Sequence, residues 1–367
     1  MDNKKIRAIG AGILVALWLV LTGFAWFGPT KEISEAERRK LDQMPKITLE
    51  SIWEGKFMGK FEDFTLDQFP LRDTFRQLKA LFHYNALGQL DNNEIYMADG
   101  YAAQLEFPMN QSSVDHAAKR FNAFYNRYLK DTGSNVFMTV VPDKGYYLAE
   151  PNGYLVMDYQ AMFDSLKQQM PWATHIDITD CLSIEDYYFT DTHWRQEKLL
   201  PVAQKLSSAL GVTAPQAGNF TVTRVERPFY GVYYGQAALP MDAEYIYYLR
   251  SDLLEQCQVL VENTTNAQVY DLTKLESLDL YDVFLSGPKS LVTIENPNAT
   301  TDRELIIVRD SFGSSVAPLL VQDYAKVTLV DIRYMQQSAV GQYVDFHGQD
   351  VLFLYSSLVL NNSDTIQ

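Results

Sequence analysis

The fold is decided by the stretch Glu304-Leu305-Ile306-Ile307-Val308-Arg309-Asp310-Ser311-Phe312-Gly313, in which an apolar run ends in a short polar motif. The run predicts a buried strand, and residues 312–322 predict the helix that follows it. Such a strand-turn-helix junction lifts a serine hydroxyl clear of the sheet, and backbone N–H groups at the start of the helix can stabilise an oxyanion. We nominate the Ser311 amide as one such donor. The arrangement suits acyl transfer.

Strand-like and helix-like segments alternate around this stretch. Residues 135–141, 326–331 and 351–355 are predicted strands, and residues 159–169 form a predicted helix. The alternation predicts an α/β fold with a mainly parallel sheet. Residues 220–297 differ because they are rich in Tyr, Thr and Val, and they predict a β-rich insertion. A serine at the carboxyl end of a strand lies where open α/β sheets bind ligands.

The second motif is Asp191-Thr192-His193-Trp194, far from Ser311 in the sequence. A serine hydroxyl is a poor nucleophile until a base takes its proton, and His193 is one of five histidines in the chain. Asp191 shares one face of an extended segment with His193, so its carboxylate can fix the imidazole tautomer. Each motif alone has a plainer explanation, because serine often caps a helix and Asp-x-His can cap a helix or bind a metal. Together they favour a serine nucleophile with a His-Asp pair.

The two motifs resemble those of the DHHW proteins, which are relatives of the alginate O-acetylation proteins in the SGNH-hydrolase-like group. The resemblance covers most of the chain after its N-terminal apolar segment. Supporting stretches are Lys60-Phe61-Glu62-Asp63-Phe64, Asp67-Gln68-Phe69-Pro70-Leu71-Arg72-Asp73, Val141-Pro142-Asp143-Lys144 and Asp331-Ile332-Arg333-Tyr334.

The resemblance implies an SGNH-hydrolase-like domain with a catalytic triad of Ser311, His193 and Asp191 that acts on O-acyl groups of an extracytoplasmic glycan. Thr192 stands where the family's name-giving tetrad has a second histidine. Because the related alginate proteins also use Asp-x-His, this departure leaves the implied triad intact. The Asp-His pair precedes the serine, whereas ordinary SGNH hydrolases have the opposite order, so the resemblance implies a permuted arrangement.

Five further residues are secondary candidates for substrate binding: Arg333, Lys144, Asp143, Trp194 and Asp310. A salt bridge with a local carboxylate is the alternative explanation for Arg333, and the same alternative applies to Asp143 and Lys144.

A metal site built from His175, Asp177, Asp191 and His193 competes with the triad. It ranks below the triad because it leaves Ser311 unexplained. The chain has no glycine-rich phosphate loop and no CxxC motif, so we expect neither a cofactor nor a metal. Cys181 and Cys257 are the only cysteines, and sequence leaves open whether they pair.

The N-terminus predicts a membrane anchor. Lys4, Lys5 and Arg7 precede the uncharged apolar residues 8–27, a length that spans a bilayer as a helix. The positive-inside rule places the N-terminus in the cytoplasm and the rest of the chain outside. A cleaved signal peptide is the competing interpretation, although the segment lacks an Ala-x-Ala site. In either case the main domain is expected to be extracytoplasmic at the cell membrane.

The predicted division of the chain has five parts. These are an anchor (1–28), a stalk (29–46), the first part of the SGNH-like domain with the Asp-His motif (47–219), the β-rich insertion (220–297) and the second part with the nucleophile (298–367). Residues 30–45 carry alternating charge and the capping pattern Ser34-x-x-Glu37, which predict a short solvated helix or a stalk leading from the membrane. Residues 47–90 have apolar residues at helical spacing, which we expect to be core positions. Helices are also expected over 114–131 and 196–210.

A formal net charge of −15 argues against nucleic acid and against an anionic bilayer surface as partners. The sequence therefore predicts a membrane-anchored, extracytoplasmic O-acyltransferase, with acetyl as the favoured acyl group and a cell-surface polysaccharide as acceptor. The resemblance also implies a membrane-bound O-acyltransferase as the partner that supplies the acyl group. A carbohydrate esterase with the same triad and a non-catalytic glycan-binding or assembly subunit remain as alternatives.

Overall fold

The computed structural model describes residues 3–263 and 265–367. The chain forms two compact units. The smaller contains the chain up to Asn93 together with Tyr234–Met241, and the larger contains Glu94–Tyr233 and Asp242–Gln367. Residues 47–93 belong to the smaller unit, and the five-part division stays a prediction.

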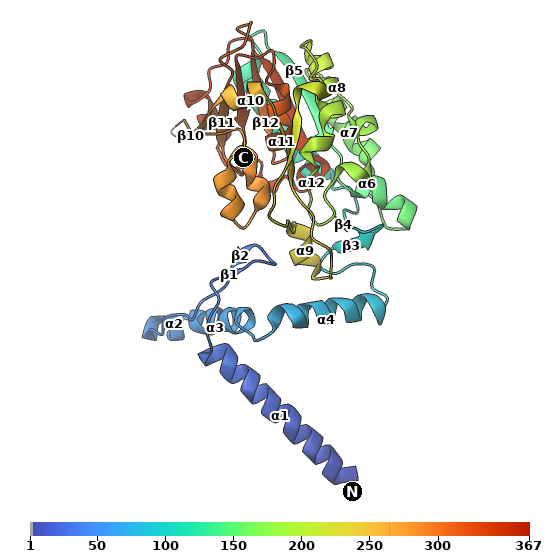
Figure 1. Cartoon of the computed structure of the whole chain (residues 1–367), viewed down its shortest axis with the longest axis vertical. Helices are drawn as coiled ribbons and strands as arrows, with labels where there is room; N and C mark the ends of the chain where they lie inside the picture. Colours follow the sequence, from blue (N-terminus) through green and yellow to red (C-terminus); the bar gives the residue numbers. More distant parts are fainter. Residues whose placement is uncertain (1–2, 264) are drawn as a thin grey trace. The chain divides into compact units, whose positions relative to one another are not determined.

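An eight-stranded sheet with the order β10-β9-β11-β13-β12-β14-β5-β6 forms the centre of the larger unit (Figure 1). Pairing is parallel from β13 to β6, whereas β11, β9 and β10 form an antiparallel edge. The predicted α/β fold with a mainly parallel sheet is confirmed. Three strands of the predicted β-rich insertion, β9, β10 and β11, extend this sheet. The strands are β5 (Asn135–Val141), β6 (Thr174–His175), β9 (Gln258–Val261), β10 (Thr265–Ala267), β11 (Leu291–Glu295), β12 (Glu304–Arg309), β13 (Lys326–Val330) and β14 (Asp350–Ser356).

The central strand β12 is buried on both faces. Leu305 and Ile307 belong to one apolar cluster, while Ile306 and Val308 belong to the cluster on the opposite face. This is the period-two alternation of a strand covered on both sides, which explains why its sequence reads as a continuous apolar run. Because β13 lies on one side of β12 and β14 on the other, the chain changes direction around β12, where such sheets place ligand sites.

Helices cover both faces of the sheet. Apolar residues of α5 (Gln111–Phe124) and α7 (Tyr159–Gln169) pack on the face that holds Ile306, and α8 (Leu200–Leu210) packs on the other. The helix predicted over 196–210 is thus α8, which has Pro201 in its first turn, where the missing N–H is tolerated. The helix predicted over 114–131 ends as α5 at Phe124 and continues as a π-helical turn over Tyr125–Leu129.

The helix predicted over 312–322 is shorter than expected. It consists of α11 (Gly313–Val316) and a 3-10 turn over Ala317–Leu320. Pro318 explains the change, because it cannot donate the backbone hydrogen bond that would continue an α-helix. The remaining elements of the larger unit are β3 (Ile95–Ala98), β4 (Tyr101–Gln104), α6 (Gly145–Leu148), β7 (Thr221–Arg224), β8 (Tyr247–Arg250), α10 (Asp252–Gln256) and α12 (Ser357–Asn361). Helix α9 (Val232–Ala237) crosses from the larger unit into the smaller.

The smaller unit is helical apart from one hairpin. It contains α1 (Asn3–Phe27), β1 (Ile33–Ser34), β2 (Arg39–Lys40), α2 (Leu49–Trp53), α3 (Lys56–Asp67) and α4 (Arg72–Asn85). The helix predicted in the stalk is wrong. Glu37 N donates to Ser34 Oγ over 3.2 Å, so the capping pattern closes the turn of the β1–β2 hairpin instead.

Among the described helices, α1 is long and apolar enough over Lys4–Phe27 to cross a membrane. The prediction that the apolar residues of 47–90 are core positions is wrong in part. Phe64 is buried, whereas Leu71, Phe75 and Leu78 are exposed. Apolar spacing identified the helices but could not identify which of their faces is covered.

Candidate active site

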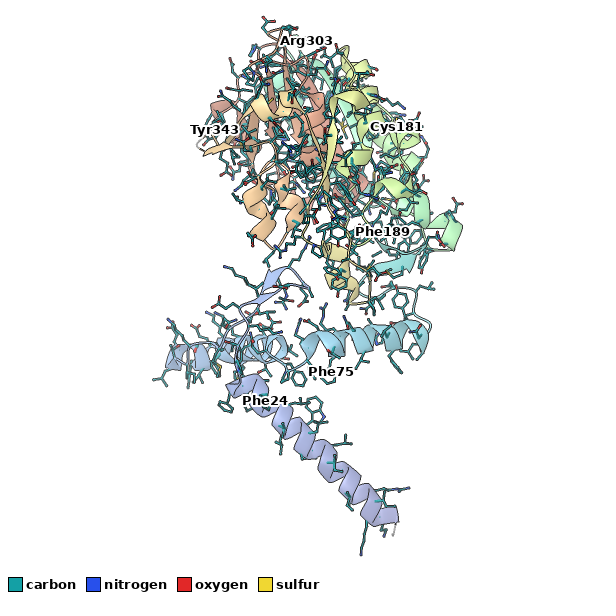
Figure 2. All side chains as sticks on the ribbon, viewed as in Figure 1. Phe24, Phe75, Cys181, Phe189, Arg303 and Tyr343 are labelled. Carbon is teal, nitrogen blue, oxygen red and sulfur yellow. The ribbon has the colours of Figure 1, made fainter. Side chains whose placement is uncertain are left out.

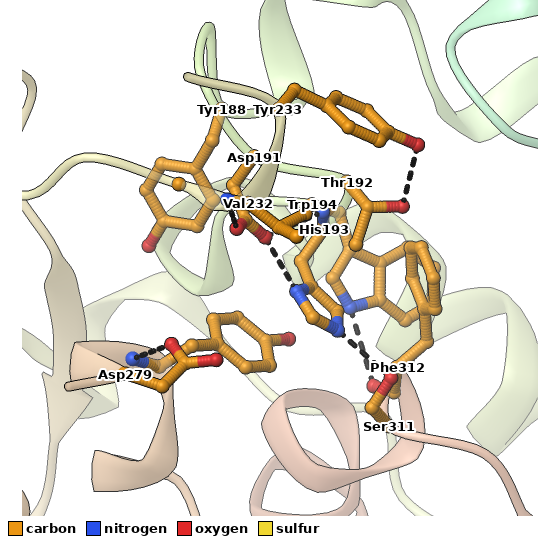
Figure 3. A network of polar contacts seen from close by, with 12 residues as sticks. Tyr188, Asp191, Thr192, His193, Trp194, Val232, Tyr233, Asp279, Ser311 and Phe312 are labelled. Carbon is orange, nitrogen blue, oxygen red and sulfur yellow. Dashed lines mark hydrogen bonds and ion pairs between the residues drawn. The ribbon is translucent and has the colours of Figure 1, made fainter. Parts of the chain in front are cut away.

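Ser311, His193 and Asp191 form one hydrogen-bonded chain, drawn in Figure 3. His193 Nε2 lies 2.8 Å from Ser311 Oγ, and His193 Nδ1 lies 2.6 Å from Asp191 Oδ1. Ser311 is half-buried at the turn after β12, whereas Asp191 is fully buried and His193 nearly so. The structure thus brings together the three residues that the two sequence motifs predicted, with the imidazole between the hydroxyl and the carboxylate.

Asp191 is held by hydrogen bonds to both carboxylate oxygens. Oδ1 also accepts from the His193 backbone N–H over 3.1 Å, and Oδ2 accepts from Val232 N over 2.9 Å. Hydrogen bonds to the charged form favour an ionised carboxylate at a buried position. Asp191 is therefore placed to orient His193 through Nδ1 and to stabilise a positive charge on its ring.

Gly231 is a site residue that sequence reasoning missed. A Cβ atom at this position would stand 2.2 Å from Asp191 Cβ and 2.3 Å from Asp191 Cα. The Gly231 backbone N–H also donates to Thr190 Oγ1 over 2.7 Å. Only glycine allows the segment before α9 to run this close to Asp191, and that approach brings the Val232 N–H to the carboxylate.

The His193 ring is stacked between aromatic groups. Its centroid is 3.9 Å from that of Tyr281 with an interplanar angle of 10°, and Phe312 is tilted against it at 4.9 Å. The Tyr281 hydroxyl donates to Ser315 Oγ over 2.8 Å, and burial raises the pKa of this phenol above its ordinary value. Stacking fixes the plane of the imidazole, so Tyr281, which no sequence motif singled out, is a positioning residue.

Two secondary candidates, Asp310 and Trp194, hold the serine turn. Asp310 Oδ1 accepts from Phe312 N over 3.0 Å, and Oδ2 accepts from Ser356 N at the end of β14 over 2.7 Å. The Trp194 indole N–H donates to Ser315 Oγ over 2.8 Å and to Phe312 O over 3.2 Å. Both side chains are fully buried. Their contacts hold the serine turn, and substrate binding by the two residues stays a prediction.

The nominated oxyanion donor, the backbone N–H of Ser311, differs from its neighbours in the turn. The Phe312 N–H is bonded to the Asp310 carboxylate, and the Gly313 N–H to the Asp310 carbonyl. Within the described residues the Ser311 N–H has no acceptor, so it can serve an oxyanion at the serine.

Lys144 is buried behind the Asp-His segment, with only 2% of its surface exposed. Its Nζ donates to the carbonyls of Tyr188 at 2.9 Å and Phe189 at 3.3 Å, and it lies 4.9 Å from the ring centroid of Tyr233. Burial lowers the pKa of Lys144 to about 7, although Glu244 and other carboxylates oppose the shift. Lys144 therefore supports the loop that leads to Asp191, and its ammonium is turned away from solvent.

Glu244 supports the same loop and was also missed. Its carboxylate accepts from Phe189 N over 2.8 Å and from Thr190 N over 2.7 Å, and it bonds the Thr190 hydroxyl. Burial raises the pKa of Glu244. The backbone just before Asp191 is thus held by Lys144 through its carbonyls and by Glu244 through its amides.

The other two secondary candidates are also engaged within the protein. Asp143 accepts from Gly145 N over 2.6 Å and from the hydroxyls of Tyr159 and Ser357, and burial raises its pKa. Arg333 makes a two-pronged ion pair with Asp331, with Nε at 2.9 Å and Nη2 at 2.7 Å from the two carboxylate oxygens. The salt bridge that competed with substrate binding is therefore the observed arrangement for Arg333.

No group of three or more His, Cys, Asp or Glu side chains in the described part of the chain is arranged to hold a metal ion. His175 lies at the edge strand β6 with Nε2 3.3 Å from Met170 O, and Asp177 bonds Thr179. Cys181 and Cys257 are both free thiols, so the pairing left open by the sequence is absent from the structure.

Comparison with known proteins supports the fold. A DHHW family protein from Eubacterium siraeum is similar to this chain with a TM-score of 0.61 and 19% identity, over 75% of this chain and 95% of that one. Bacillus cereus PatB1 is similar with a TM-score of 0.61 and 19% identity, over 74% of this chain and 98% of that one. A second PatB1 structure carries a sulfonyl adduct. The resemblance to DHHW proteins is therefore confirmed at the level of the fold.

The O-acetyltransferase domain of Pseudomonas putida AlgJ aligns with a TM-score of 0.43 and 13% identity, over 73% of this chain and 92% of that one, too low to establish a shared fold. No family model matches the chain. No curated protein matches it in sequence either.

Proposed function

We propose that this protein is a membrane-anchored, extracytoplasmic O-acyltransferase that moves acetyl groups onto a cell-surface polysaccharide through Ser311, His193 and Asp191. The observation that carries the proposal is the hydrogen-bonded chain from Ser311 Oγ to His193 Nε2 at 2.8 Å and from His193 Nδ1 to Asp191 at 2.6 Å. The fold shared with a DHHW family protein supports it, because the resemblance implies this chemistry.

The proposed reaction has two steps. His193 Nε2 accepts the Ser311 proton while Oγ attacks the carbonyl carbon of an acyl donor, and the donor's leaving group departs with that proton. The Ser311 amide stabilises the oxyanion of the tetrahedral intermediate. In the second step His193 takes the proton of a sugar hydroxyl as its oxygen attacks the acyl-serine, and the imidazolium then returns this proton to Ser311 Oγ as the acyl–serine bond breaks. Asp191 stabilises the imidazolium in both steps.

Helix α1 supports the proposed location. Its apolar stretch is long enough for one span, and the basic residues Lys4, Lys5 and Arg7 precede it. By the positive-inside rule the unit with the sheet lies outside the cytoplasm, on the side where surface polysaccharides are found. We further propose that a membrane-bound O-acyltransferase supplies the acyl group, since an activated acyl donor must otherwise cross the bilayer.

The test uses the full chain in detergent, with p-nitrophenyl acetate as donor. We expect acetate release by the wild type and its loss in Ser311→Ala and His193→Ala. Ser208→Ala on the exposed side of α8 is the matched control and should keep wild-type activity. Phenylmethylsulfonyl fluoride should add one sulfonyl group to the wild type and to Ser208→Ala, and none to Ser311→Ala. Mass spectrometry of the intact protein measures this.

Adding acetyl-accepting oligosaccharides separates transfer from hydrolysis. An acetylated oligosaccharide, detected by mass spectrometry, supports the transferase, whereas acetate alone supports a carbohydrate esterase with the same triad. Two results would remove the catalytic proposal and leave a glycan-binding or assembly role. The first is equal acetate release by the wild type and Ser311→Ala. The second is a folded wild type that releases no acetate and is not sulfonylated.

A further inference from the structure

Helix α4 exposes a continuous apolar face. Leu71, Phe75, Leu78 and Phe82 are 68%, 46%, 56% and 58% exposed, and Phe75 is labelled in Figure 2. The spacing of Phe75, Leu78 and Phe82 places these three on one side of α4, and Leu71 is the residue just before the helix. Soluble proteins rarely leave such a row uncovered, and a row of this kind marks a surface for a membrane or another protein.

The opposite side of α4 is already used within the smaller unit. Ala80 is completely buried, and Arg76 bonds Gly235 O over 2.7 Å and pairs with Glu37 at 3.3 Å. The apolar face is therefore the outer face of α4. The lateral flank carries Lys79, which is exposed.

Helices α2 and α3 continue this apolar surface. Leu49 and Trp53 on α2 are 90% and 93% exposed, and Ile52 lies one turn from Leu49 on the same side. On α3, Met58 and Leu66 are exposed, and the helix also carries the exposed cations Lys56 and Lys60. Exposed Trp, Phe and Leu next to Lys side chains are typical of helices that lie in the plane of a membrane surface.

Contacts with α1 tie α3 and the link that follows it to the outer half of the proposed span. Trp26 Nε1 donates to Thr65 Oγ1 over 3.2 Å, its ring is 5.4 Å from Phe61, and Trp18 is 6.0 Å from Phe69. Trp18 is nine residues before the end of α1, about 14 Å along a helix that must cross a hydrocarbon core of about 30 Å. The Phe69 side chain therefore touches the outer half of the span, which holds the link between α3 and α4 beside the outer end of α1.

We propose that α2, α3 and α4 lie in the outer membrane–water interface, with the apolar face of Leu49, Trp53, Leu71, Phe75, Leu78 and Phe82 against lipid. This inference rests on the proposed anchor and goes beyond it, because it gives the smaller unit a second, in-plane attachment to the bilayer. Lipid is the occupant because Phe75 on this face packs against Phe69, with 5.7 Å between ring centroids, and Phe69 in turn touches Trp18 of the span.

The test places fluorescent probes on the full chain in phosphatidylcholine vesicles. In a Cys181→Ala, Cys257→Ala background, a polarity-sensitive fluorophore is attached at Leu78→Cys on the apolar face or at Asp73→Cys on the other side of the same helix. We expect a blue-shifted emission at position 78 that nitroxide-labelled lipid quenches and aqueous iodide does not. The opposite pattern is expected at position 73. Trp53→Cys provides an independent probe on α2 and should behave like position 78.

The outcomes separate this inference from the anchor. Extraction of the chain by alkaline carbonate would refute the anchor, and the interfacial placement with it. The chain could instead resist extraction while iodide quenches the probe at position 78 as strongly as at position 73. This result would support the anchor and overturn the interfacial placement. Cross-linking between position 78 of two copies at high lipid dilution would also overturn it, because the face would then be covered by protein.

Discussion

Replacement of Gly231 by alanine tests whether the active site depends on a close backbone approach. The added Cβ would stand 2.2 Å from Asp191 Cβ and 2.5 Å from Asp191 N, whereas ordinary van der Waals contact begins at 3.4 Å. One of the two segments must therefore move by about 1.2 Å, and neither contact is with a flexible side-chain end. The movement lengthens the bonds that Asp191 makes with Val232 N and His193 Nδ1, which are 2.9 and 2.6 Å long.

A displacement of about 1 Å in a catalytic group costs about 100-fold in rate, or about 2.7 kcal/mol of transition-state stabilisation. We therefore expect Gly231→Ala to lower kcat for p-nitrophenyl acetate about 100-fold, and overpacking to lower the free energy of unfolding by about 1–3 kcal/mol. Gly218→Ala is the matched control, since a Cβ there meets nothing within 4 Å. The reasoning is refuted if Gly231→Ala keeps kcat within threefold of the wild type while Gly218→Ala is normal.

Three further predictions concern the groups around His193. Asp191→Asn should keep its fold, as measured by circular dichroism. It should lower kcat about 10⁴-fold, because the amide favours the wrong imidazole tautomer. A loss of kcat below tenfold would contradict this role of Asp191. Tyr281→Phe keeps the stacked ring and should stay within about threefold of wild-type kcat, whereas Tyr281→Leu should lose up to about tenfold; equal losses would assign the effect to the hydroxyl bonded to Ser315. Lys144 has a pKa of about 7 when folded and about 10.5 when unfolded, so between these values the unfolded state binds more protons and stability rises with pH. Urea unfolding between pH 7.5 and 9.5 should show this rise, at most about 1.4 kcal/mol per pH unit, and a Lys144→Met variant that keeps the same slope would refute the assignment.

Local sequence signals predicted the elements that carry the chemistry. The strand at 135–141 and the helix at 159–169 have the predicted bounds, and Ser311 follows β12 as expected. Apolar runs, and the polar residues that end them, are properties of neighbouring residues, so they can be recognised within a single segment. The meeting of Ser311 with His193, 118 residues away, was predicted only because two motifs and a family resemblance pointed to it.

The groups that support the triad could not be predicted in this way. Gly231, Glu244 and Tyr281 act through contacts with segments tens of residues away, and none belongs to a motif. Tyr281 lies in the predicted insertion, where abundant tyrosines offered no reason to prefer one. The exposed face of α4 was missed for a related reason, because helical spacing of apolar residues is the same whether protein or lipid covers them.

The full burial of β12 on both faces also bears on when activity is lost. Backbone amides of a central strand exchange with solvent only when the whole sheet opens, whereas edge strands such as β6 and β10 open at lower free energy. Ser311 directly follows that protected strand, so the nucleophile is expected to stay in place through local openings of the sheet edges. Inactivation by heat or denaturant should then coincide with deuterium uptake in Leu305–Val308 and lag behind uptake at the edges.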